Sequence, residues 1–135
     1  MDVSFTFSNC NNVKFFFTHN NIENIIVAES DFYTFTISNC DSGDLIKIRH
    51  TSAEFVNLED IRINFISFKN LIIKDSNYWQ VVNEFDQKIG DQIITIGSPD
   101  TCKLILPEDL YKKYIDTLEK SANTYQYLFN LKTFD

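Results

Sequence analysis

The stretch Val3-Ser4-Phe5-Thr6-Phe7-Ser8-Asn9-Cys10 decides the fold class of this chain. Its first six residues alternate strictly between apolar side chains and hydroxyl side chains. Successive side chains of a strand point to opposite faces, so the pattern predicts a β-strand with one buried and one exposed face. A related stretch, Phe35-Thr36-Ile37-Ser38-Asn39-Cys40, follows thirty residues later. The same kind of strand is therefore expected twice.

Further segments with a period of two run through the first hundred residues and are separated by turn-forming Asn, Asp, Gly and Ser. They are Val13–Thr18, Ile25–Ala28, Tyr33–Ser38, Leu45–His50, Phe55–Leu58, Ile61–Phe68, Leu71–Lys74, Tyr78–Phe85, Gln92–Ile96 and Cys102–Leu106. The turn Ser98-Pro99-Asp100-Thr101 predicts that the last two pair as a hairpin. We therefore predict one mainly β (α+β) domain over residues 1–135, an antiparallel β-sandwich or barrel of about 8–10 strands.

The period changes after Pro107, a residue suited to the first turn of a helix. Acidic residues at 108 and 109 complement the positive end of a helix dipole. Apolar residues then recur at helical spacing, at Leu110, Tyr114, Leu118, Ala122, Tyr125 and Phe129. This predicts one amphipathic helix over about 107–122, with the stripe running on to about 131, packed on the sheet.

The thirty-residue repeat favours an alternative fold. Self-similarity at a fixed period is typical of solenoids, in which like residues stack in successive coils. In a short β-solenoid Asn9 and Asn39 would form a ladder, and the C-terminal helix would cap the open end.

Composition limits the function classes. The 135 residues carry 19 acidic and 12 basic side chains, a net charge of -7, and include 13 Phe. No run of Lys or Arg occurs, so binding to nucleic acid or to an anionic membrane is not expected. The N-terminus lacks the charge and the apolar run of a signal peptide, and no apolar run is long enough for a membrane helix. We therefore expect a cytoplasmic protein.

Catalytic motifs are absent from the sequence. Two histidines, His19 and His50, and three cysteines, Cys10, Cys40 and Cys102, are the available nucleophiles and metal ligands. A Cys–His catalytic pair or a zinc site built from them are alternatives, but the cysteines lack the close spacing of structural zinc sites. We expect reduced, buried thiols, no enzymatic activity, no cofactor and no metal.

The acidic residues are the leading candidates for contact with a partner. They cluster in two blocks of the sequence, and Glu84 and Asp86 would share one face of a strand. The lone tryptophan, beside polar residues, is either a core residue or a binding anchor. The predicted partner-binding set is Asp41, Asp44, Glu84, Asp86, Asp91 and Trp79.

Small size, acidity and a β scaffold favour a non-enzymatic protein-binding domain. One form of it is an acidic inhibitor, an immunity protein or a counter-defence protein that neutralises a basic partner through electrostatic steering. The first alternative is a structural or assembly subunit that self-associates through exposed β edges. The second is a barrel that binds a small apolar ligand between Phe-rich strands.

Overall fold

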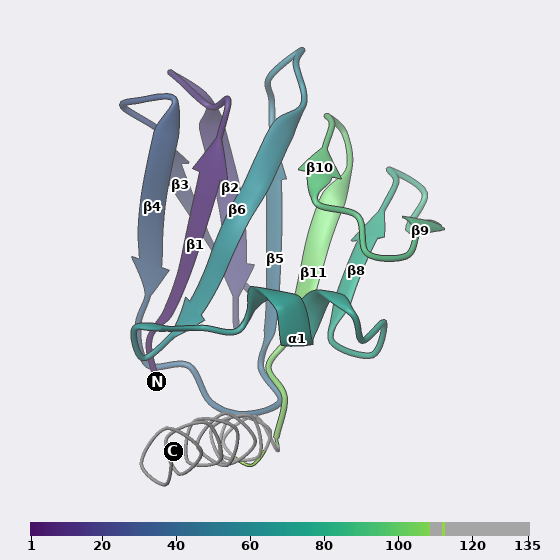
Figure 1. Ribbon diagram of the computed structural model, residues 1–135. Coiled ribbons are helices and arrows are strands. Elements are labelled where there is room, and N and C mark those ends of the chain that lie inside the picture. The colour runs from purple at the N-terminus through teal and green to yellow at the C-terminus, as the bar shows by residue number, and fades with distance from the viewer. Residues whose placement is uncertain (109–111, 113–135) are drawn as a thin grey trace, which may run out of the picture.

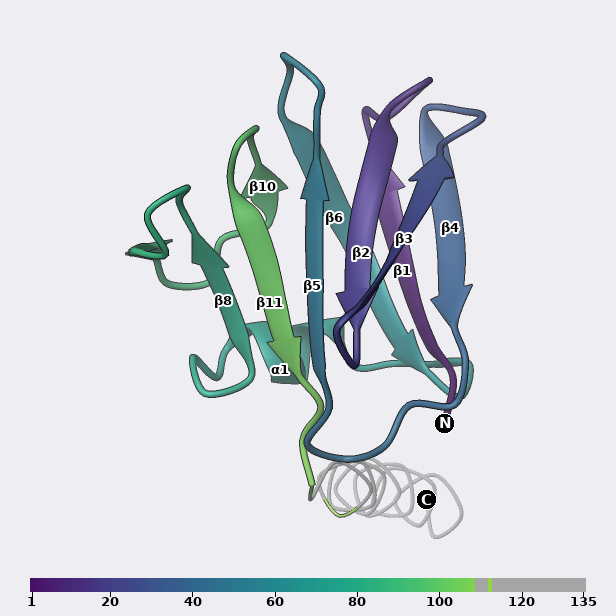
Figure 2. The same cartoon turned by 180° about the vertical axis from the view of Figure 1, so that it is seen from behind.

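The computed structural model describes residues 1–108 and 112, which form two antiparallel β-sheets packed face to face (Figures 1 and 2). Sheet A has the order β10-β6-β1-β4, with β7 paired to β6. Its strands are β1 (Val3–Ser8), β4 (Phe32–Ile37), β6 (Val56–Ile63), β7 (Ile66–Ser67) and β10 (Thr95–Ile96). Sheet B has the order β3-β2-β5-β11-β8-β9. Its strands are β2 (Lys14–His19), β3 (Ile22–Val27), β5 (Leu45–His50), β8 (Trp79–Val82), β9 (Lys88–Gly90) and β11 (Thr101–Ile105).

Phenylalanine rings from the two sheets meet in the core. Phe7 of β1 stacks on Phe15 of β2 with ring centroids 4.9 Å apart, and Phe35 of β4 stacks on Phe17 of β2 at 5.4 Å. These residues occupy the apolar positions of the alternating segments, and all four are buried. Offset aromatic stacking adds to the hydrophobic gain from burying such large side chains. The alternation thus supplies the contacts that hold sheet A on sheet B.

The repeated stretch has a different role from the one a solenoid would give it. Strand β1 pairs with β4 in antiparallel fashion, with Phe5 opposite Phe35, so like residues do not stack in parallel coils and the solenoid alternative is wrong. Each copy ends instead in the same local structure. Asn9 and Asn39 take left-handed φ values of 56° and 59°, which Asn tolerates better than most residues. The following cysteine is buried, and its thiol donates to the carbonyl three residues earlier at 3.5 Å.

Asparagine supplies most of the left-handed backbone in the described residues. The Asn20-Asn21 loop joins β2 to β3, and both residues have positive φ, as a two-residue type I′ hairpin turn requires. The asparagines with positive φ are Asn9, Asn12, Asn20, Asn21, Asn39 and Asn64. A chain with only three glycines therefore makes its tight turns with Asn.

The structure corrects one expected strand pairing and one expected strand. The 92–96 and 102–106 segments do not form a hairpin, because β10 pairs with β6 in sheet A while β11 pairs with β5 and β8 in sheet B. The turn between them crosses from one sheet to the other. The segment 71–74 is not a strand but part of helix α1 (Lys69–Ile73). Phe68 and Ile72, four residues apart, are both buried, and this spacing is helical.

Other sequence-based expectations agree with the structure only in part or lie outside the described residues. The two sheets are not closed into a barrel, so the barrel form of the prediction is wrong and the sandwich form is correct. The 61–68 segment is interrupted after Ile63 by a turn, and the 78–85 strand is confined to Trp79–Val82. The predicted helix over about 107–122 lies almost entirely outside the described residues. No described helix has the length and apolar character needed to cross a membrane.

Candidate functional site

The acidic residues singled out from the sequence lie in two separate places (Figure 1). Asp41 and Asp44 belong to the loop between β4 and β5, at the lower end of the sandwich in this view. Glu84, Asp86 and Asp91 lie around β9, the edge strand of sheet B next to β8. The structure therefore does not gather the five carboxylates into one surface.

Asp44 is bound within its own loop. Its carboxylate accepts a hydrogen bond from the backbone N–H of Asp41 at 2.8 Å and lies 2.8 Å from Nε2 of His19. The backbone hydrogen bond, followed by the contact with His19, lowers the pKa of Asp44 from its ordinary value. This carboxylate fixes the loop, which accounts for its presence without a partner.

The second acidic group faces lysines. Asp86 pairs with Lys103, whose hydrogen bond and positive charge lower the pKa of the carboxyl group, and Asp91 pairs with Lys88. Glu84 and Asp86 lie in the turn after β8 rather than on one face of a strand, which corrects the expectation. In this turn Asp86 adopts a positive φ of 61°, and Asn83 Oδ1 accepts hydrogen bonds from the backbone N–H groups of Phe85 and Gln87.

Trp79 is a core residue. Its side chain is 2% exposed, and its indole N–H donates to the carbonyl of Ile93 at 2.8 Å. The prediction of a binding anchor at this position is wrong, because β8 places the ring on the inner face of sheet B. A buried indole with its single donor satisfied is the usual state of a core tryptophan.

The cysteines and histidines do not assemble into a reactive centre in the described residues. All three thiols are free and buried, and burial is the largest cause that raises the pKa of each. No cluster of three or more potential metal ligands occurs among these residues. His50 is buried: its Nδ1 accepts the Ser52 N–H at 3.1 Å and its Nε2 donates to the Ile96 carbonyl at 2.7 Å. This histidine therefore ties β5 of sheet B to β10 of sheet A.

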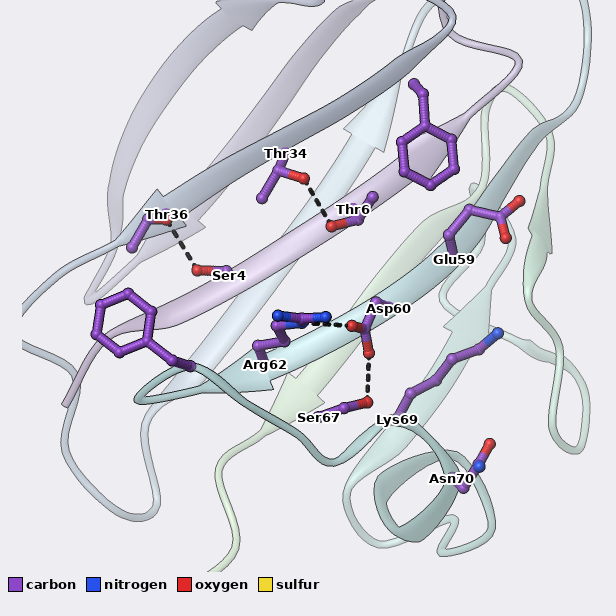
Figure 3. Close-up of a pocket in the computed structure, with 12 residues that line it drawn as sticks. Ser4, Thr6, Thr34, Thr36, Glu59, Asp60, Arg62, Ser67, Lys69 and Asn70 are labelled. Atoms are coloured by element: carbon purple, nitrogen blue, oxygen red, sulfur yellow. Dashed lines mark hydrogen bonds and ion pairs between the residues drawn. The ribbon is translucent and has the colours of Figure 1, made fainter.

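A broad hollow of about 900 Å³ lies on the outer face of sheet A (Figure 3). Its floor consists of hydroxyl side chains from β1 and β4, the polar positions of the two alternating stretches. Those of β4 are exposed, whereas Ser4 is half-buried and Thr6 is buried. Ser4 and Thr36 are hydrogen-bonded at 2.8 Å, and Thr6 and Thr34 at 2.7 Å. Each hydroxyl has one donor and two acceptor sites, so every pair keeps capacity for a further polar group.

A β-bulge in β6 shapes one side of this hollow. Thr6 lies opposite Asp60 and Phe7 lies opposite Leu58, so Glu59 is an extra residue in β6. A bulge of this kind re-aims side chains, and here Glu59 and Asp60 both line the outer face while the flanking apolar residues stay buried. Ser8 donates a hydrogen bond to Glu59.

Asp60 lies on the β6 side of the hollow, where two hydrogen bonds stabilise its ionised carboxylate. It accepts hydrogen bonds from Arg62 Nε at 2.7 Å and from Ser67 Oγ at 2.6 Å (Figure 3). Partial burial acts to raise the pKa of Asp60, but the hydrogen bonds from Ser67 and Arg62 outweigh it and the pKa is lowered. Lys69 and Asn70 of α1 complete the polar border.

Two exposed phenyl rings also line the hollow. Phe32, at the start of β4, is 62% exposed, and Phe65, in the turn between β6 and β7, is 86% exposed. Asn64 and Phe65 form a two-residue hairpin loop with positive φ values of 47° and 70°. Asn64 exchanges hydrogen bonds with the backbone of Asp2, from its own N–H and to its side-chain oxygen, which fixes the position of the turn.

Sequence reasoning missed this site. The expected strand over 61–68 aligned Phe65 with Ile61 and Ile63 as an inward residue, whereas the turn at Asn64 exposes it. The available signal was the asparagine between two apolar residues, the same residue type that forms the Asn20-Asn21 turn.

No protein-family model matches this chain, and comparisons with curated proteins and with solved structures found no similar protein.

Proposed function

We propose that this chain is a non-enzymatic protein-binding domain and that the outer face of sheet A is its contact surface. The hydroxyl pairs and the Asp60–Arg62 ion pair form the polar middle of this surface, and Phe32 and Phe65 are its apolar anchors. Aromatic side chains account for much of the binding energy of many protein interfaces, and polar groups around them give specificity.

The observation that carries this proposal is the position of Phe65. The second residue of a type I′ loop strongly favours glycine, and a side chain with a β-carbon costs about 1–2 kcal/mol in the left-handed region. The ring is 86% exposed, so burial in the fold does not offset that cost. Strained residues persist mainly where they serve a function. An exposed ring on a strained backbone is suited to insertion into a partner.

The charge of the chain supports a partner with a basic surface. The net charge of -7 favours encounter with a positively charged protein. The acidic residues of the loop between β4 and β5 and of the region around β9 contribute to the negative electrostatic field of the whole protein. They do not form one contact patch. An inhibitor or immunity protein that neutralises a basic partner is the form of this function that the charge favours.

The test uses Phe65→Gly as bait in affinity capture from the source organism, beside the wild-type chain. Glycine removes the ring and also relieves the strain, so the variant is expected to be at least as stable as the wild type in urea unfolding. We expect the wild type to retain a protein that Phe65→Gly and Phe32→Ala lose. Phe85→Ala removes an exposed ring from the turn after β8 and serves as the matched control.

Retention of the same protein by Phe65→Gly and the wild type would contradict the proposal. So would capture of no protein by any of the four baits. Loss of the partner in Phe85→Ala alone would move the contact surface to the β8–β9 side of the molecule.

A further inference from the structure

The two sides of the sandwich differ in how their edge strands are protected. On one side the edges are short, since β9 has three residues and β10 and β7 have two each. On the other side β3 and β4 are both six residues long and lie beside each other (Figures 1 and 2). Proteins usually protect long edges with charged side chains, especially Lys, with Pro or with a bulge. Strand β3 (Ile-Glu-Asn-Ile-Ile-Val) has no Lys, Pro or bulge, and Glu23 is its one charged residue. An edge of this length with so little protection is suited to pairing with another strand.

The hairpin register shows which backbone groups β3 leaves free. His19 lies opposite Ile22 across a two-residue loop, so Ile22, Asn24 and Ile26 direct their N–H and C=O groups toward β2. Ala28, two residues after Ile26, follows the same alternation, because its N–H donates to the carbonyl of Val13, the residue before β2. The residues between them, Glu23, Ile25 and Val27, direct their backbone groups outward, where no described strand pairs with them.

Two of the side chains at the same positions, Ile25 and Val27, are apolar and exposed on the outer face of sheet B. Ile25 is 59% exposed and lies opposite Phe16 of β2, which in turn lies opposite Arg49 of β5. The Arg49 guanidinium stacks over the Phe16 ring at 4.0 Å and pairs with Glu23 at 3.3 Å. The row Arg49–Phe16–Ile25 thus runs across three strands and ends, uncovered, at the free edge.

We propose that a second copy of this chain covers this edge, with β3 pairing antiparallel to β3 of its partner about a twofold axis at Ile25. In this register Ile25 lies opposite its own symmetry mate, and Glu23 lies opposite Val27. The three residues with outward backbone groups then exchange hydrogen bonds with their counterparts. The apolar row becomes continuous across the joint, Phe16–Ile25–Ile25–Phe16, with an Arg49 guanidinium at either end.

Self-pairing fits this edge better than pairing with an unrelated strand. Antiparallel pairing of a strand with itself is closed by a twofold axis, so the assembly stops at a dimer and leaves no new copy of the same edge. Glu23 is the only charged residue of β3, and the register places it opposite Val27, so no like charges face each other. The outward side chains of β4 are instead Phe32, Thr34 and Thr36, which belong to the proposed contact surface of sheet A.

Analytical ultracentrifugation of the full chain over a range of concentrations tests the proposal. We expect a reversible dimer for the wild type. Ile25→Lys places two like charges opposite each other and is expected to raise the dimer Kd by about tenfold or more. Ile105→Lys adds the same charge at an exposed position on the same outer face, within β11 and away from the edge, and is expected to dimerise like the wild type.

Cysteine cross-linking tests the register. The native cysteines are buried, so an introduced surface cysteine is the reactive one. Under mild oxidation Ile25→Cys is expected to form a covalent dimer, because directly opposite residues have Cα atoms close enough for a disulfide. Val27→Cys is expected to stay largely uncross-linked, because Glu23 lies opposite it. A monomeric wild type at all concentrations, or equal weakening by Ile105→Lys, would overturn the proposal, and faster cross-linking of Val27→Cys would overturn the register.

Discussion

At the scale of single residues, several polar groups that resembled functional candidates act within the fold. His50 joins the two sheets, Trp79 fills the core, and Asp44 holds its loop through the Asp41 backbone and His19. Phe65 is the opposite case, because it is apolar, strained and exposed. In this protein, an exposed side chain without a structural role indicates a contact surface better than a charged side chain that stabilises the fold.

Asp44 gives a prediction about pH. Because hydrogen bonds lower its folded pKa, the ionised carboxylate stabilises the folded state at pH values above the ordinary Asp pKa of about 3.9. That contribution is lost as the pH falls through the lower, folded pKa. Asp44→Asn should therefore reduce the free energy of unfolding at neutral pH, and its difference from the wild type should shrink and vanish as the solution is made strongly acidic.

Urea unfolding at a series of pH values measures this difference. Asp41→Asn is the matched control, because it changes an exposed carboxylate in the same loop and leaves the backbone donor in place. A deficit of Asp44→Asn that stayed constant into strong acid would show that the lost interaction is not that of the carboxylate.

At the scale of elements, the repeated Ser-Asn-Cys sequence is a device that ends a strand. The asparagine turns the backbone into the left-handed region, and the cysteine then enters the core. The two copies differ in one respect. The Asn9 side-chain amide donates to the Phe55 carbonyl at 2.8 Å and so ties the end of β1 to the residue before β6, whereas no such bond is found for the Asn39 side chain in the described residues.

This difference predicts unequal effects of glycine at the two positions. Asn39→Gly keeps the left-handed backbone accessible and should change stability by only a few tenths of a kcal/mol, while Asn39→Ala should cost about 1 kcal/mol or more. Asn9→Gly also loses a hydrogen bond and should cost about 1 kcal/mol more than Asn39→Gly. Urea denaturation of the three variants measures these values, and equal costs for the two glycine variants would count against a role for the Asn9 amide.

Alternation in the sequence was sufficient to place most strands and their buried faces, because it reflects a two-residue period that burial imposes directly. It predicted the buried Phe5 and Phe35 and the hydroxyls on the opposite face that line the floor of the hollow, although Thr6 among them is itself buried. It did not predict which strands pair, because β10 and β11 follow each other in sequence and yet belong to different sheets. Pairing depends on contacts distant in sequence, which a local pattern does not contain.

The candidate site was predictable only in part for the same reason. Its hydroxyl floor follows from the alternation, but Asp60 reaches the outer face through a bulge that is defined by the register between β1 and β6. Phe65 was assigned to the core because its spacing from Ile61 and Ile63 fits a continuous strand. A short apolar segment interrupted by a single Asn gives no periodic signal strong enough to show a turn.

At the scale of the whole molecule, the two proposed surfaces have a fixed geometric relation. A twofold axis that pairs β3 with its symmetry mate is perpendicular to sheet B, so it keeps each face of the sandwich on its own side. Sheet A lies over sheet B in each copy (Figures 1 and 2). The two outer faces of sheet A in a dimer would therefore point in the same direction, as two binding sites for one surface.

Such an arrangement predicts avidity that depends on the β3 edge. On a surface densely coated with the captured partner, the wild-type dimer should dissociate about a hundredfold or more slowly than the Ile25→Lys variant, because the second contact becomes intramolecular. At sparse coating the two proteins should dissociate at the same rate, since Ile25 lies on sheet B and does not line the hollow. Surface plasmon resonance at two coating densities measures both rates. Equal dissociation of the two proteins at high density would mean that the dimer does not present its two sheet A faces to one surface, whereas loss of binding by Ile25→Lys even at sparse coating would place the β3 edge within the contact surface itself.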